Sequence, residues 1–203
     1  MLQDLRHKTT LRGAAVGVIG LTLAGCSLFK GPPPVTYNLV TPAAAARLAG
    51  STNAQILVPE ATALETLNTI RVVVSTDGKL SYYPEVQLPD RLPKVLQDKI
   101  VSTLQVSKKV QAVGRPGEGL SIDYQLATNI RTFEFDAGPG PLTARVSIYA
   151  QLLDDRNGRA IATKLFSATA PVKADNGDGV IAALDTALAK VLLDMAAWTL
   201  QAI

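Results

Sequence analysis

The most reactive side chains in this chain of 203 residues belong to one cysteine, Cys26, and one histidine, His7. A disulfide needs a second cysteine, so Cys26 has no disulfide partner within the chain. Cys26 follows an uncharged apolar run, "GAAVGVIGLTLAG". This position points to a modification of the thiol that depends on the residues before it.

Residues 1–25 have the three parts of a secretory signal peptide. Residues 1–12 carry three basic residues against one acidic residue, and residues 13–25 carry no charge and end in small residues. The apolar run is too short to span a bilayer, which needs about 20 residues. A buried N-terminal helix is the alternative, but the run is glycine-rich and lacks a polar face. We therefore expect residues 1–25 to be a cleaved signal peptide.

The stretch Leu23, Ala24, Gly25 and Cys26 resembles the lipobox of bacterial lipoproteins. In that family, an aliphatic residue and two small residues fit a dedicated peptidase, a diacylglycerol is attached to the thiol, and cleavage frees the amine for an N-acyl chain. Stable anchoring needs more than one chain, because each buried methylene contributes only about 0.8 kcal/mol. Ser27 stands where an aspartate commonly retains lipoproteins at the inner membrane. The resemblance therefore implies an anchor in the outer membrane of a two-membrane bacterium.

Cleavage would leave a nearly neutral chain without histidine, because three basic residues, one acidic residue and His7 lie before Cys26. We therefore expect no nucleic-acid partner. An acylated cysteine and no histidine exclude a Ser–His or Cys–His nucleophile and a His or Cys zinc site. We expect no enzyme, no metal and no cofactor beyond the covalent lipid, although a carboxylate pair or a Ser–Lys arrangement stays open.

Three other motifs favour structural roles. The loop "GRPGEG", residues 114–119, fits neither a P-loop nor a dinucleotide fingerprint. Asp154 and Asp155 are adjacent at a strand end, so their side chains should point to opposite faces as solvated turn residues. The sequence "DNGDG", residues 175–179, lacks the spacing and the distal glutamate of a calcium loop, which favours a helix N-cap.

The three prolines of "SLFKGPPPVT" predict that residues 26–36 form a lipidated tether of extended polyproline II. A loop packed on the domain is the alternative. Residues 37–203 then form the folded domain.

The domain is predicted to be a single α/β domain with a mixed, largely antiparallel sheet packed by amphipathic helices, an α/β sandwich. Helical spacing follows Asp90, the expected N-cap, with Pro93 in the first turn. The last helix has an apolar stripe that Trp198 extends, and the long strand 120–137 should bend near Thr132. The elements expected are strands at 37–40, 54–60, 69–75, 79–83, 111–113, 120–137, 143–155 and 159–172, helices from 90 and from 180, and an undecided segment at 43–46.

Over roughly residues 36–200, the chain resembles the ABC-type transport auxiliary lipoprotein family. The stretches that carry the resemblance are "YNLV", "ILVPEATALETLNTIRVVV", "LSYYPEVQLPDRLPKVLQDKI", "AVG", "DYQLATNIRTFEFD", "LLDDRNGRAIATKLFSATAPV" and "AAWTL". The resemblance implies an α/β sandwich fold and a periplasm-facing lipoprotein that accompanies an ABC transporter with an MCE-type (Pqi-type) subunit in lipid movement between membranes. Some members resemble ring-forming oligomers, so a homo-oligomer stays open.

The leading hypothesis is therefore a non-enzymatic anchor and docking module of such a system. The alternatives are an outer-membrane assembly or structural lipoprotein, and a carboxylate-based envelope hydrolase. Tyr82 and Tyr83 are candidate partner-binding residues, because tyrosine is enriched at interfaces, but a core or cross-strand pair with one ring inward is favoured. Leu88 stands where the family usually has a tryptophan, which puts any contact built on that ring in doubt.

Overall fold

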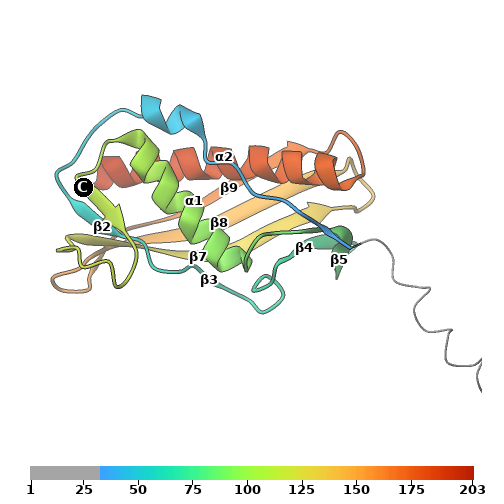
Figure 1. The fold of residues 1–203 in the computed structure, drawn as a ribbon, viewed down its shortest axis with the longest axis horizontal. Coiled ribbons are helices and arrows are strands. Elements are labelled where there is room, and N and C mark those ends of the chain that lie inside the picture. Colours follow the sequence, from blue (N-terminus) through green and yellow to red (C-terminus); the bar gives the residue numbers. More distant parts are fainter. Residues whose placement is uncertain (1–32) are drawn as a thin grey trace, which may run out of the picture. The chain divides into compact units, whose positions relative to one another are not determined.

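Three long antiparallel strands organise the fold of residues 33–203, the part of the chain that the computed structural model describes. β7 (Tyr124–Asp136), β8 (Thr143–Asp154) and β9 (Ala160–Pro171) form the meander that their alternating residues predict (Figure 1). Alternate positions point to opposite faces of a strand. One face of β8 is therefore buried from Ala144 to Leu152, whereas the intervening residues are partly exposed.

The other edge of β7 pairs in parallel with three short strands, one after another. These are β2 (Gln55–Leu57), β3 (Thr62–Ala63) and β4 (Arg71–Thr76). The sheet extends further through β6 (Ala112–Gly114), which is parallel to β2, β5 (Lys79–Gln87), which is antiparallel to β4, and β1 (Val35–Thr36), which is parallel to β5. The predicted mixed sheet is thus confirmed.

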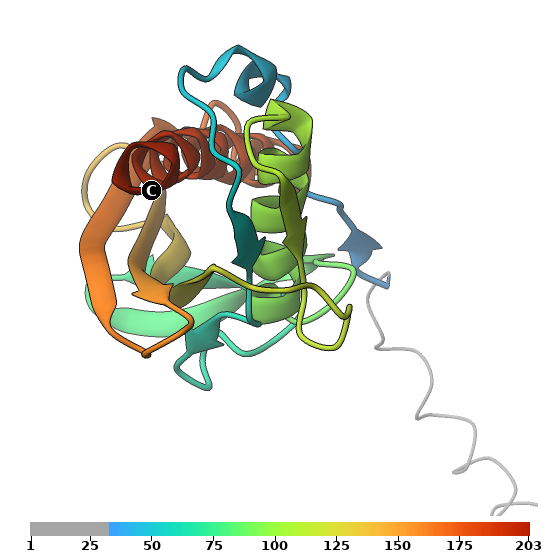
Figure 2. The ribbon, with the colours of Figure 1, turned by 90° about the vertical axis from the view of Figure 1, so that its left-hand side faces the viewer.

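Two helices pack on one side of this sheet, and Figure 2 shows the strands curving around them. α1 spans Leu92–Ser107 and α2 spans Gly177–Ala202. Their apolar stripes and the inner faces of the strands form one core, which confirms the predicted amphipathic helices. Trp198 packs edge-to-face on Phe166 of β9, with ring centroids 5.5 Å apart. The largest fully buried side chains are Leu39, Ile56, Leu88, Ile100, Leu104, Leu126, Ile148, Leu152, Leu184, Leu188, Leu192 and Met195.

The start of α1 differs from the prediction. The N-cap is Arg91, which makes no side-chain capping bond, and Pro93 lies in the first turn as predicted. Asp90 instead accepts a hydrogen bond from the backbone N–H of Arg91 and pairs with Lys94 at 2.7 Å. Lys94 holds the pKa of Asp90 below its usual value through this hydrogen bond. α2 has the N-cap predicted within residues 175–179, because the Asn176 side chain accepts from the backbone N–H of Gly179, but the helix begins at Gly177 and not at the predicted 180.

The first predicted strand, at 37–40, is wrong, because the strand lies two residues earlier, at β1. Val35 and Thr36 were expected at the end of the tether, but they pair with Val86 and Gln87 of β5. The undecided alanine run is a 3-10 helix, η2 (Ala43–Arg47).

Candidate interaction surfaces

The predicted lipidation site lies outside the described residues. Leu23, Ala24, Gly25, Cys26 and Ser27 all precede residue 33, where the description begins. Their roles therefore stay predictions, and the described part of the chain shows how the domain begins after them.

Two carboxylates of α2 hold the first residues of the domain, and we call this arrangement the N-terminal clamp. The Tyr37 hydroxyl donates to Asp178 Oδ1 at 2.7 Å, and the Val40 backbone N–H donates to Asp185 Oδ1 at 2.8 Å. Asp178 and Asp185 are seven positions apart, so they lie on the same side of the helix. The segment that follows β1 is therefore fixed along α2 by two separate hydrogen bonds.

Asp185 is the clamp residue with the most unusual electrostatics. Its burial raises the pKa of the carboxyl, whereas the Val40 N–H and the charge of Lys99 act in the opposite direction. Burial disfavours the charged form of a carboxyl. Keeping Asp185 charged therefore costs free energy, and the charged group accepts the hydrogen bond from the Val40 N–H in the clamp.

Tyr82 and Tyr83 lie next to each other on β5 and take different environments. The Tyr83 ring packs edge-to-face on buried Phe135, with centroids 6.1 Å apart, and its hydroxyl reaches Asp175 at 3.4 Å. The Tyr82 ring lies under the guanidinium of Arg71, with Arg71 Cζ 3.7 Å from the ring centroid. Both rings are partly buried and pack against the core, but Tyr83 contacts a buried ring whereas Tyr82 contacts the exposed Arg71, so Tyr82 is the better candidate contact.

A second stacked pair lies on β7 and β8. Arg131 Cζ is 5.6 Å from the centroid of the Tyr149 ring. Tyr149 alternates with the buried Ile148 and Ala150, so its ring lies on the face turned away from the helices. We call the four residues Arg71, Tyr82, Arg131 and Tyr149 the arginine–tyrosine face.

The acidic residues near this sheet are held by neighbouring donors. Arg145 contacts Glu134, and it pairs with Asp136 at 3.1 Å. Glu134 raises the pKa of the Arg145 guanidinium through this hydrogen bond. These ion pairs link β7 to β8 across the sheet.

The predicted solvated turn at Asp154 and Asp155 is only half right. Asp155 is exposed and accepts from the Gln125 side chain. Asp154 is buried and accepts from Arg156 Nη2 at 2.9 Å and from Asn157 Nδ2 at 3.2 Å, closing the β8–β9 hairpin. The hydrogen bond from Arg156 is the main cause that lowers the pKa of Asp154.

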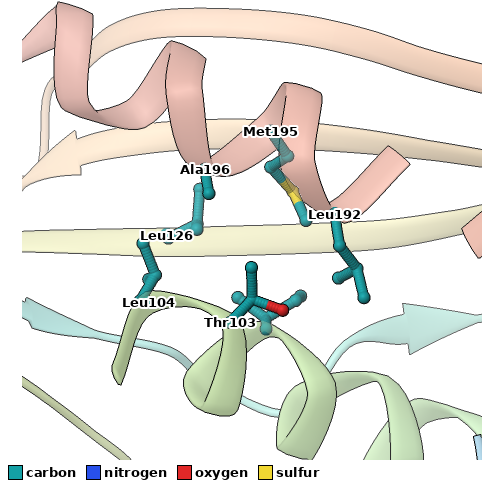
Figure 3. Close-up of a pocket in the computed structure, with 7 residues that line it drawn as sticks. Thr103, Leu104, Leu126, Leu192, Met195 and Ala196 are labelled. Atoms are coloured by element: carbon teal, nitrogen blue, oxygen red, sulfur yellow. The ribbon is translucent and has the colours of Figure 1, made fainter. Parts of the chain in front are cut away.

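Between the helices and β7 runs an apolar seam rather than an open cavity. Figure 3 shows Leu104 and Thr103 of α1 facing Leu192 and Met195 of α2 across Leu126 of β7. The space between these side chains holds no room for a water molecule. The seam therefore works as packing. A shallower depression of about 430 Å³ opens at the end of α1, lined by Leu104, Gln105, Lys108, Val110, Gln111, Ala112 and Val113.

The described residues, 33–203 without the side chain of Glu85, also bear on membrane and metal binding. Within that range, no helix is both long enough and apolar enough to cross a bilayer. The same range contains no group of three or more His, Cys, Asp or Glu side chains placed to hold a metal ion. The described chain is thus an α/β domain whose arginine–tyrosine face combines exposed arginines with partly exposed tyrosine rings, and the buried side chain of Asp154 is engaged in structural hydrogen bonds.

Comparisons with known proteins identify the class. Residues 37–196 match the model of a family described as the ABC-type transport auxiliary lipoprotein component, and the chain belongs to this family. The family is thus one of auxiliary lipoprotein components, and an auxiliary role is the coarse function that membership supports.

The similar proteins include one relative and two solved structures. An uncharacterized protein of Bradyrhizobium diazoefficiens, bll6063, is 26% identical over 198 residues, which are 98% of this chain and 52% of the relative. The chain thus spans about half the length of the curated relative that it matches. The crystal structure of protein XCC0632 from Xanthomonas campestris is 27% identical, with a TM-score of 0.72 over 83% of this chain and 93% of that chain. A crystal structure of an uncharacterized protein is 15% identical, with a TM-score of 0.63 over 84% of this chain and 98% of that chain, and it supports the fold alone.

Arg71 and Arg131 are absent from the sequence-based candidates. In sequence, each is one of many surface cations, and neither belongs to a motif. The available signal was the bend predicted near Thr132, because a bulge places an extra residue on one face of a strand.

Proposed function

We propose that this chain is the lipid-anchored auxiliary subunit of an MCE-type ABC transport system that moves lipid between the two membranes of a bacterium. The observation that carries the proposal is the succession of two features. A cysteine in a lipobox-like stretch, Leu23 to Cys26, is followed after a short proline segment by a domain of a transport lipoprotein family.

In this proposal, Cys26 bears a diacylglycerol and an N-acyl chain, and Ser27 directs the protein to the periplasmic leaflet of the outer membrane. Residues 27–34 form the tether, which in polyproline II would reach about 25 Å at about 3.1 Å per residue. The N-terminal clamp supports this arrangement, because it fixes the point at which the tether leaves the domain. The domain then works by position and by binding.

The anchor is tested by intact mass and by membrane fractionation of the protein from its own cells. We expect loss of residues 1–25 and acyl chains on Cys26, and we expect Cys26→Ala to stay unacylated. Ser27→Asp should move the protein to the inner membrane, whereas Ser27→Thr, the matched control, should leave it in the outer membrane. An unacylated wild type that keeps its leader would contradict the proposal.

A further inference from the structure

Two arginines of the described domain lie over a tyrosine ring, whereas four others pair with an acid. Arg71 lies over Tyr82 and Arg131 over Tyr149, at 3.7 Å and 5.6 Å from the ring centroids. Among the side chains that the structure describes, which exclude that of Glu85, no carboxylate lies within ion-pair distance of either arginine. The arginines that do have one are Arg91, Arg115, Arg145 and Arg156.

The strand register brings these arginines to one face. Ile130 pairs with Ile148 and Thr132 with Ser147, so Arg131 is the extra residue of a bulge. In a β-bulge, two consecutive residues of the bulged strand lie opposite one residue of the partner strand. Arg131 is exposed there, beside the outward-facing Ser147.

Arg71 reaches the same face from the neighbouring strand. Val73 pairs in parallel with Glu134 of β7 and lies opposite Tyr82 of β5. Arg71 precedes Val73 by two residues, and the contact of its guanidinium with the Tyr82 ring places it on the same side of the sheet as Tyr82. A register irregularity separates Arg71 from Val73, as one also accompanies Arg131.

The surroundings of these arginines resemble a protein interface more than a membrane-binding patch. Leu165 lies opposite Tyr149 in the β8–β9 ladder and is 55% exposed. Arginine and tyrosine are residue types enriched at contact hot spots, and Leu165 adds exposed apolar area beside them. Attraction to anionic lipid needs a cluster of about 4–8 basic residues, whereas the arginine–tyrosine face offers two arginines, Arg71 and Arg131.

We propose that the arginine–tyrosine face is the docking surface for an acidic segment of a partner protein. Two carboxylates of that segment pair with the guanidinium groups of Arg71 and Arg131, and its apolar side chains cover Leu165. A guanidinium matches a carboxylate with two parallel hydrogen bonds, and stacking on a ring holds its plane in place before the partner arrives. That the partner is a subunit of the transport system rests on the proposed function.

The test places a photo-crosslinking amino acid at Leu165 of the full-length lipoprotein, expressed in its own cells at native level. Irradiation should yield a protein adduct whose mapped crosslink lies in a segment rich in Asp or Glu. Arg71→Glu together with Arg131→Glu should lower the adduct at least about tenfold, as loss of paired interface charges does. Reversing the mapped acids to arginine should restore it.

Arg159→Glu is the control, because it makes the charge change of one of these two substitutions at the exposed start of the β8–β9 return and should leave the adduct unchanged. Arg71→Lys with Arg131→Lys keeps the charge but loses the planar fork, so it should give an intermediate loss. Thermal denaturation of each variant separates loss of docking from loss of folding.

The outcomes separate this inference from the proposed function. An adduct with lipid, with a second copy of this chain or with a segment lacking acidic residues would overturn the docking inference, as would an adduct that the glutamate variants leave intact. An acidic segment that belongs to a protein outside any ABC transport system would support the docking face and count against the proposed function.

Discussion

Shortening Leu126 to alanine tests the packing of the apolar seam. Leu126 is fully buried at 0% exposure and lies between α1 and α2, where the seam has no room for water. Neighbours fixed on two helices cannot close the gap that the substitution would leave. Buried Leu→Ala changes cost about 3–5 kcal/mol, the higher values where the cavity persists. We expect about 4 kcal/mol for Leu126→Ala.

This loss corresponds to a fall in Tm of about 8–16 °C, because 1 kcal/mol shifts Tm by about 2–4 °C in a domain of this size. The assay is urea denaturation with calorimetry on the purified protein. Leu80→Ala removes the same atoms from a side chain that is 55% exposed, and it should cost less than about 1 kcal/mol. The reasoning is refuted if the free energies of unfolding of the two variants agree within about 1 kcal/mol.

Three further changes test the electrostatics and the helix start. Burial raises the folded-state pKa of Asp185 above the usual 3.8. Wild type should therefore gain stability relative to Asp185→Asn as the pH falls through that raised pKa towards 3.8. A wild type that instead gains stability relative to the variant as the pH rises would contradict this assignment. The pKa of Asp154 is shifted the other way, because Arg156 lowers it. In urea titrations, the extra stability of wild type over Asp154→Asn should therefore be lost as the pH falls below 3.8. Asn176→Ala removes the N-cap of α2 and should cost about 1 kcal/mol in the same titration, and an unchanged midpoint would show that the cap does not stabilise the helix.

The parts of the fold that were predictable from the sequence are those with local signals. Alternation over β7, β8 and β9, the bend beside Thr132 and the cap at Asn176 all depend on neighbours within a few residues. β1 was misplaced because Val35 is a strand residue only through its pairing with distant Val86, which no local pattern reports.

The candidate site was less predictable for the same reason. Tyr82 was a candidate by residue type alone. The residue that stacks on its ring, Arg71, lies beside a register irregularity between β4 and β5, which no local sequence pattern indicates. Arg131 depends on a bulge in the same way. The assignment of Asp90 as the cap of α1 was wrong, because Asp90 lies one residue before the N-cap, Arg91. Its side chain bonds instead to the Arg91 N–H and to Lys94.

The central claim is that an acylated lipoprotein serves an MCE-type transport system by binding, and crosslinking in intact cells tests it most directly. The tagged full-length protein is crosslinked at native level and purified, and the captured proteins are identified by mass spectrometry. The account predicts enrichment of an MCE-type subunit with wild type and its loss with Cys26→Ala. Capture of β-barrel assembly proteins without any transport subunit would contradict it.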